Sequence, residues 1–68
     1  MTKRITTYTG KAYQCTVRLD RELEEYVAKL YRIADNHLIG EYFTEDINDA
    51  LQTAEAMFNK AENAKHIS

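Results

Sequence analysis

The sequence contains no proline, and its only glycines are Gly10 and Gly40. Links between domains are often rich in proline, glycine or serine, and neither such a stretch nor an internal repeat interrupts this chain. Its 68 residues are enough for one small domain at most. We therefore expect a single small domain over residues 1–68, with a flexible arm at 1–10, a folded core at 12–62 and a frayed tail at 63–68.

Cysteine occurs once, as Cys15, which excludes a disulfide bond within the chain. No apolar run approaches the length of a membrane span or of a signal-peptide core, so we predict a cytoplasmic protein that does not enter the membrane. Basic residues are also few, because 9 Lys and Arg face 11 Asp and Glu for a net charge of −2. The chain lacks the overall positive field that favours nucleic-acid binding, and any DNA-binding role would need a local basic face.

The composition, with 44% hydrophobic and 29% charged residues, is that of an ordinary globular protein. The chain should therefore fold rather than remain disordered. A core of this size rarely supplies more than about 3–5 kcal/mol. We therefore expect either a homodimer or a stabilising partner.

The clearest local signal is an amphipathic helix at about residues 45–62. Thr44 is suited to cap its first turn, and Glu45 and Asp46 place negative charge at the positive end of the helix dipole. Apolar residues recur at helical spacing along one stripe, which predicts a buried face: Ile47, Ala50, Leu51, Ala54, Met57, Phe58 and Ala61.

Three earlier segments are candidates for strands. Residues 12–19 alternate apolar and polar side chains, as in a half-buried strand, and residues 38–43 form a second apolar segment. Residues 24–33 fit either a helix or a strand, but 38–43 would lack a pairing neighbour if they were helical. A turn at Asp35 and Asn36 would join the two strands as a hairpin.

These elements predict an α+β fold, in which a three-stranded antiparallel sheet carries one C-terminal helix on one face, in the order βββα. The helix should cover the apolar side of the first two strands. Eight residues are expected to meet in the core: Tyr13, Cys15, Val17, Leu30, Ile47, Leu51, Ala54 and Phe58.

The run Tyr42-Phe43-Thr44-x-Asp46-x-x-Asp49-Ala50-x-x-Thr53-Ala54 resembles a motif of small uncharacterised phage and mobile-element proteins. The resemblance implies three antiparallel strands followed by one helix. Together with the small size and the acidity, it favours a non-enzymatic interaction protein. Such a protein would inhibit a host defence or nucleic-acid-processing complex by covering its surface, as anti-CRISPR proteins do, so the expected partner is a host protein or protein–RNA complex.

Acidic residues near the start of the predicted helix are the candidate partner-binding site. Glu41, Glu45, Asp46 and Asp49 would form a patch able to engage a basic groove on a partner. Catalysis by such carboxylates would require a pocket that raises a pKa, and a chain of this size hardly encloses one. We therefore predict no enzymatic activity and no cofactor.

Metal binding is not expected either. The two histidines, His37 and His66, share no ligand spacing with Cys15 or with each other. A solvated role beside a turn is expected for His37.

An alternative comes from residues 14–23, which resemble the start of a ribbon-helix-helix repressor, a βαα dimer. The resemblance implies that Gln14, Thr16 and Arg18 enter the DNA major groove from a two-chain ribbon. Phosphate contacts would come from Lys3, Arg4 and Lys11. The chain departs from that family in a longer connection after residue 34 and in the acids at 45–46, where the second helix would bind phosphate.

Overall fold

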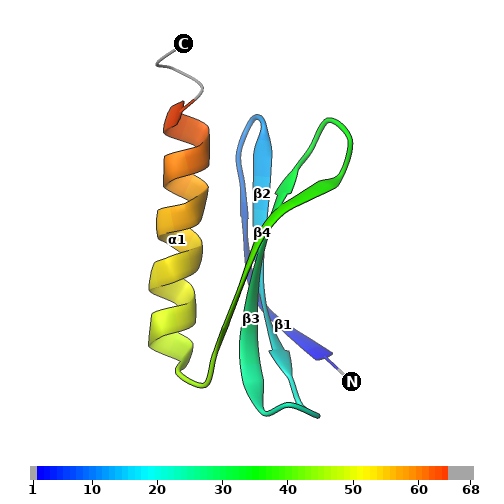
Figure 1. Ribbon diagram of the computed structural model, residues 1–68, viewed down its shortest axis with the longest axis vertical. Helices are drawn as coiled ribbons and strands as arrows, with labels where there is room; N and C mark the ends of the chain where they lie inside the picture. Colours follow the sequence, from blue (N-terminus) through cyan, green and yellow to red (C-terminus); the bar gives the residue numbers. More distant parts are fainter. Residues whose placement is uncertain (1, 65–68) are drawn as a thin grey trace.

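The computed structural model describes residues 2–64 and contains one antiparallel sheet followed by one helix (Figure 1). The sheet has the strand order β1-β2-β3-β4, so each strand pairs with its neighbour in the chain. The elements are β1 (Thr2–Thr9), β2 (Tyr13–Asp20), β3 (Glu25–Arg32), β4 (His37–Thr44) and α1 (Ile47–Ala64). The predicted α+β class, with a C-terminal helix on an antiparallel sheet, is confirmed.

The number of strands differs from the prediction, because the sheet has four strands and not three. The additional strand, β1, covers residues that were expected to form a flexible arm. Its threonines are β-branched and suit a strand, but they give no apolar alternation. Ile5 and Tyr8 nevertheless pack against the core. Most of the predicted tail, residues 65–68, lies outside the described residues, while Asn63 and Ala64 close α1.

The segment that fits both helix and strand is strand β3, which pairs with β2 over residues 25–32 and with β4 over residues 26–32, with a register shift between Leu30 and Tyr31. The ribbon-helix-helix alternative requires a helix at these residues, so its βαα fold is wrong for this chain. The turn into β4 spans the four residues 33–36 rather than two, and it ends at Asn36 with φ of 55°. The β2–β3 turn, residues 21–24, ends in the same left-handed conformation at Glu24.

The helix is capped by Asp46, one residue before α1, and not by Thr44. The backbone N–H of Asn48 donates to Asp46 Oδ1 at 2.9 Å, and the N–H of Ala50 donates to the Asp46 carbonyl at 3.0 Å. Thr44 instead accepts a hydrogen bond from the Asp46 N–H at 3.2 Å and so shapes the entry into the helix.

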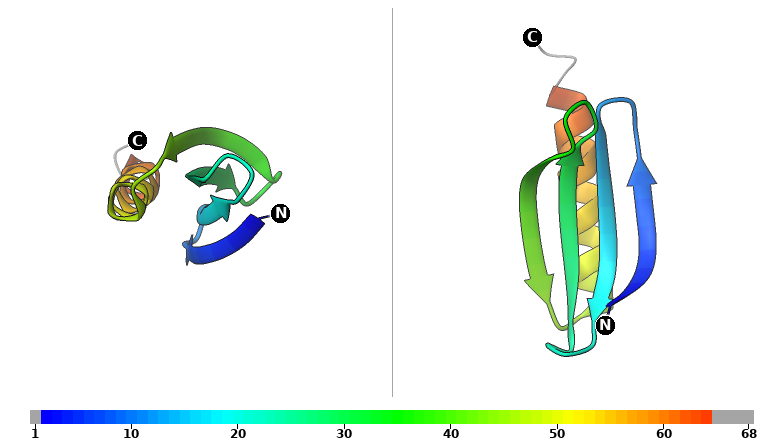
Figure 2. Two further views of the ribbon diagram at one scale, coloured as in Figure 1. Left: turned by 90° about the horizontal axis from the view of Figure 1, so that it is seen from below. Right: turned by 90° about the vertical axis from the view of Figure 1, so that its right-hand side faces the viewer.

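α1 lies along one face of the sheet (Figure 2), and small side chains occupy the contact between the two. Ala50 and Ala54 on the helix and Ala28 on β3 are all fully buried. Of the eight predicted core residues, four belong to the buried cluster and three, Tyr13, Leu51 and Phe58, are partly buried and pack against it, while Ile47 is in neither group. The buried cluster consists of Cys15, Val17, Ala28, Leu30, Ala50 and Ala54.

A long-range contact fastens the end of α1 to the β1–β2 turn. Glu62 Oε2 accepts hydrogen bonds from the backbone N–H groups of Ala12 and Tyr13 at 3.0 and 2.8 Å. Gly10 lies against the same carboxylate, and a Cβ atom built there would meet Glu62 and would lie 2.8 Å from Phe58 Cζ. The absence of a side chain at position 10 is therefore what allows Glu62 to reach the turn.

Candidate interaction surface

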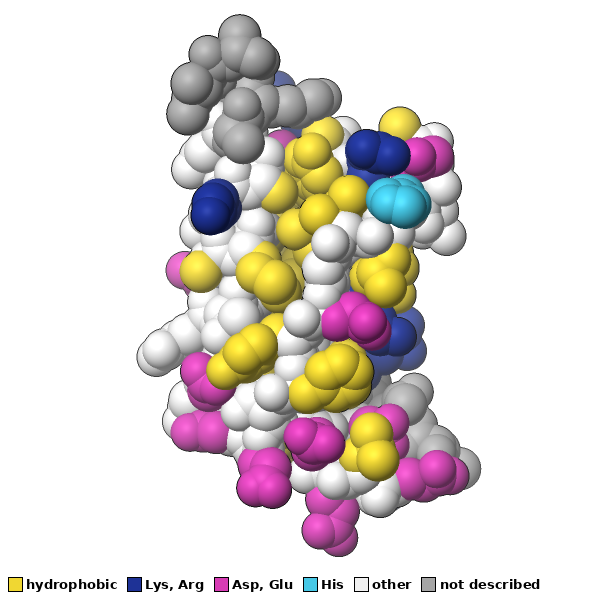
Figure 3. Space-filling model, viewed as in Figure 1, with side chains coloured by type: hydrophobic (Ala, Val, Ile, Leu, Met, Phe, Trp, Pro, Cys, Tyr) yellow, Lys and Arg dark blue, Asp and Glu magenta, His cyan; other side chains and the backbone are white. Residues whose placement is uncertain are grey.

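Acidic side chains gather at the end of the molecule where α1 begins. The register pairs Asp20 with Glu25 and Tyr26 with Thr44, so the β2–β3 turn and the entry to α1 share one end of the sheet. Figure 3 shows these acids together at the lower end of the molecule. We call this surface the acidic end. It contains seven of the eleven acidic residues of the chain: Asp20, Glu22, Glu24, Glu25, Glu45, Asp46 and Asp49.

The acids predicted near the helix start have different local roles. Glu45 and Asp46 are exposed at the acidic end, although Asp46 is also the helix cap. Asp49 is half-buried, and its Oδ2 accepts a hydrogen bond of 2.6 Å from the Tyr42 hydroxyl. This hydrogen bond, together with burial, raises the pKa of Tyr42. Asp49 therefore links α1 to β4 as well as contributing charge.

Glu41 does not join this group. It stands opposite Lys29 on the sheet, with 3.9 Å between Lys29 Nζ and Glu41 Oε2. Both side chains are more than a third exposed, so the ion pair adds little stability. Three of the four predicted acids therefore lie at the acidic end, where Asp20, Glu22, Glu24 and Glu25 join them. The order of residues in the chain could not reveal the acidic end, because only the pairing of the strands brings the β2–β3 turn next to the start of α1.

The residues of the DNA-binding alternative lie on β2. Arg18 is exposed, whereas Thr16 is buried at 8% exposure and Gln14 is half-buried. β2 pairs with β1 on one side and β3 on the other. It therefore has no free edge with which to form a ribbon with a second chain. Lys11 is exposed at the β1–β2 turn, and the side chains of Lys3 and Arg4 lie outside the described part of the structure.

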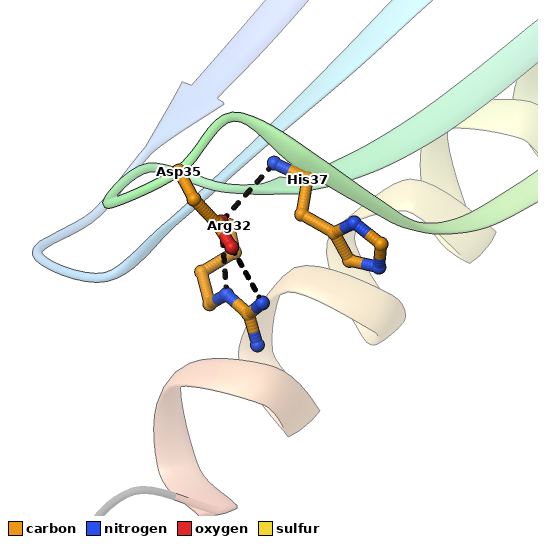
Figure 4. Close-up of polar contacts among 3 residues, drawn as sticks. All are labelled: Arg32, Asp35 and His37. Carbon is orange, nitrogen blue, oxygen red and sulfur yellow. Dashed lines mark hydrogen bonds and ion pairs between the residues drawn. The ribbon is translucent and has the colours of Figure 1, made fainter.

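A second polar cluster organises the β3–β4 turn (Figure 4). Arg32 Nε and Nη2 donate to the two carboxylate oxygens of Asp35 at 3.0 and 2.7 Å, and the His37 N–H donates to Asp35 Oδ1 at 3.2 Å. The hydrogen bond from Arg32 lowers the pKa of Asp35 to about 2. These contacts shape the turn, and they give the predicted turn residue Asp35 a specific role.

An apolar groove runs between α1 and the first half of β4. Its volume is about 380 Å³. Figure 3 shows hydrophobic side chains, in yellow, in the upper middle of the molecule, between α1 and β4. A Cβ atom at Gly40 would meet nothing within 4 Å, so the missing side chain leaves this space open. A glycine within a strand is the sequence feature that could have indicated this open space. We call this feature the edge groove; it is lined by Tyr13, Leu30, Ile39, Gly40, Met57, Lys60 and Ala61.

The remaining groups to place are metal ligands and the single thiol. Within residues 2–64 no three His, Cys, Asp or Glu side chains are grouped to hold a metal ion. Cys15 is buried, and burial raises the pKa of its thiol to about 11, so the thiolate is scarce at neutral pH.

Among residues 2–64, no helix is both long enough and apolar enough to cross a membrane.

Comparison with known proteins identifies no family for this chain. No protein-family model matches the chain, and no match is found among curated proteins or solved structures. The resemblance to small phage and mobile-element proteins therefore stays a prediction.

Proposed function

We propose that this chain is a small, non-enzymatic interaction protein of phage or mobile-element type. It acts in the cytoplasm and covers a basic surface of a host defence or nucleic-acid-processing complex, in the manner of an anti-CRISPR protein. The observation that carries the proposal is the acidic end, where two separate segments of the chain contribute seven acids. Complementary charge of this kind accelerates association and orients the partners.

Some acids of the acidic end have a structural role in the fold and others have none that the structure shows. The second group supports a role in binding a partner. Asp46 caps the helix and Asp49 bonds Tyr42. Glu24 and Glu45, in contrast, are exposed in the turn and the loop. Like charges held close together cost free energy unless a partner neutralises them. A basic surface would relieve this repulsion.

The size of the molecule fits an occluding role. Its accessible surface is 4823 Å². A standard interface uses roughly 800 Å² on each partner, about a sixth of that surface. An interface of this size would leave most of the molecule free to project and block access to the bound surface.

The test is a charge reversal at the acidic end with a matched reversal elsewhere. The protein is immobilised and used to capture partners from host lysate, with Glu45→Lys and Glu55→Lys as variants. Both residues are exposed and both changes raise the net charge equally, but Glu55 lies further along α1, outside the acidic end. We expect Glu45→Lys to lose the captured partner and Glu55→Lys to keep it, with capture weakening as salt rises.

Two outcomes would overturn the proposal. One is capture that both variants retain equally, which would place the interface elsewhere. The other is specific binding to labelled duplex DNA that Arg18→Ala abolishes, since this would favour the DNA-binding alternative.

A further inference from the structure

β4 is an edge strand, and its outer backbone N–H and C=O groups face no other strand within residues 2–64. Such an edge is a template for another extended chain. The structure describes five exposed large hydrophobic side chains, and three of them, Leu38, Ile39 and Phe43, lie on β4. The opposite edge strand, β1, is rich in threonine. The two edges therefore differ, and β4 is the one suited to an apolar neighbour.

The edge groove lies beside this strand on the side of α1. A strand added to β4 would point alternate side chains toward the helix. The groove offers them an apolar wall of Leu30 and Met57, and Gly40 leaves room above it. A volume of about 380 Å³ accommodates a large aliphatic side chain with space to spare. Main-chain pairing and side-chain burial would thus occur at the same place.

Charge sets a direction along this surface. Lys60 lines the groove, whereas the other end of β4 leads to Glu45 and Asp46 at the acidic end. A bound segment would therefore have its basic residues beside the acidic end and its apolar residue in the groove. A second copy of β4 fits less well, because two-fold antiparallel pairing centred on Glu41 would place two Glu41 carboxylates opposite each other.

We propose that β4 receives an extended segment of the partner protein as a fifth strand, with a large aliphatic side chain in the edge groove and Lys or Arg against the acidic end. This inference rests on the proposed function and specifies the partner's recognition element. It assigns main-chain pairing to β4, apolar selectivity to the groove and orientation to the acids.

The probes are two synthetic peptides, acetyl-KRTVLVT-amide and acetyl-TVLVTKR-amide, which cover both strand directions. They are titrated into the ¹⁵N-labelled protein. We expect one of them to shift the amide signals of β4 and of the groove residues and to slow hydrogen exchange along the outer side of β4. Replacing the leucine of that peptide with aspartate, or methylating the backbone nitrogens that face β4, should remove binding.

Protein variants separate the groove from the strand edge. Gly40→Leu fills the groove and should weaken peptide binding by about tenfold or more, whereas Gly40→Ala should leave most of the groove open and keep binding. Ile39→Lys places a charge on the edge and should also weaken binding. Each variant is first checked for an unchanged fold by its amide spectrum.

Several results would overturn the inference. These are the absence of binding by either peptide, signals that move on β1 instead of β4, and affinity unchanged by Gly40→Leu. Sedimentation of the protein alone is a further test, because a dimer that Ile39→Lys breaks would assign β4 to a second copy. If captured partner is lost with Glu45→Lys but kept with Gly40→Leu, the proposed function stands and the fifth strand is wrong. If Glu45→Lys has no effect on partner capture, the proposed function itself fails.

Discussion

Replacing Gly10 with alanine tests the contact that fastens the end of α1 to the β1–β2 turn. The new methyl group would meet the Glu62 carboxylate and lie 2.8 Å from Phe58 Cζ, closer than such carbon atoms normally approach. The carboxylate would therefore have to move and lose its hydrogen bonds to the Ala12 and Tyr13 amides. Free energy of unfolding should fall as a result.

The magnitude follows from two opposing effects. Hydrogen bonds to a charged group contribute about 1.5–3 kcal/mol, and water can replace part of this at a half-buried site. Alanine also restricts the unfolded chain, which returns about 0.4–1 kcal/mol. We expect a net loss of about 1–2 kcal/mol, which is a large share of the stability of so small a domain.

Urea unfolding followed by circular dichroism measures this loss. Gly40→Ala is the matched control, because its methyl group meets nothing within 4 Å and should have little effect. In a double-mutant cycle, Gly10→Ala should cost much less once Glu62→Ala has removed the carboxylate. A neutral Gly10→Ala, or losses that simply add in the double variant, would refute the role given to this contact.

Three further predictions concern the helix–sheet contact. The pKa of Tyr42 is raised in the fold above its unfolded value of about 10, so its hydrogen bond to Asp49 stabilises below that pH and is lost as pH rises through the folded pKa. Urea unfolding at increasing pH should therefore show wild type and Tyr42→Phe converging in alkali, and a constant difference would contradict this. Ala54→Leu should cost about 1–3 kcal/mol by overpacking a fully buried position, while Ala56→Leu, on the exposed side of α1, should be nearly neutral in the same assay. Cys15 should react with a thiol reagent only when the protein opens, so its labelling rate should rise with urea, and fast labelling of the native protein would show that the core is not closed.

Sequence patterns predict most of the elements but not the whole sheet. The alternation in β2 and the apolar stripe of α1 are strong signals because each has a buried side. β3 could be predicted only indirectly, since β4 needed a neighbour. β1 was not predicted because its apolar and polar residues do not alternate regularly; Ile5 and Tyr8 are the residues of β1 that pack against the core. The helix cap was displaced by two residues, from Thr44 to Asp46, because both can accept a hydrogen bond at a helix start.

The candidate site was predictable only in part, for a topological reason. Glu45 and Asp46 are adjacent to a recognisable helix start, and their position follows from the sequence alone. Glu22 and Glu24 come to the same end only because β2, β3 and β4 are antiparallel and in register. Glu41 was grouped with them because it is close in the chain, but it lies opposite Lys29 in the sheet and forms an ion pair with it.

The central claim is that the acidic end is the surface that meets a partner. The most direct measurement is an NMR titration of the ¹⁵N-labelled protein with the partner that it captures. Signals of residues 20–25 and 44–49 should shift first and most, and raising the salt should reverse the shifts. Shifts concentrated instead at the β1–β2 turn, residues 10–12, would contradict the claim, because that turn lies at the opposite end of the sheet.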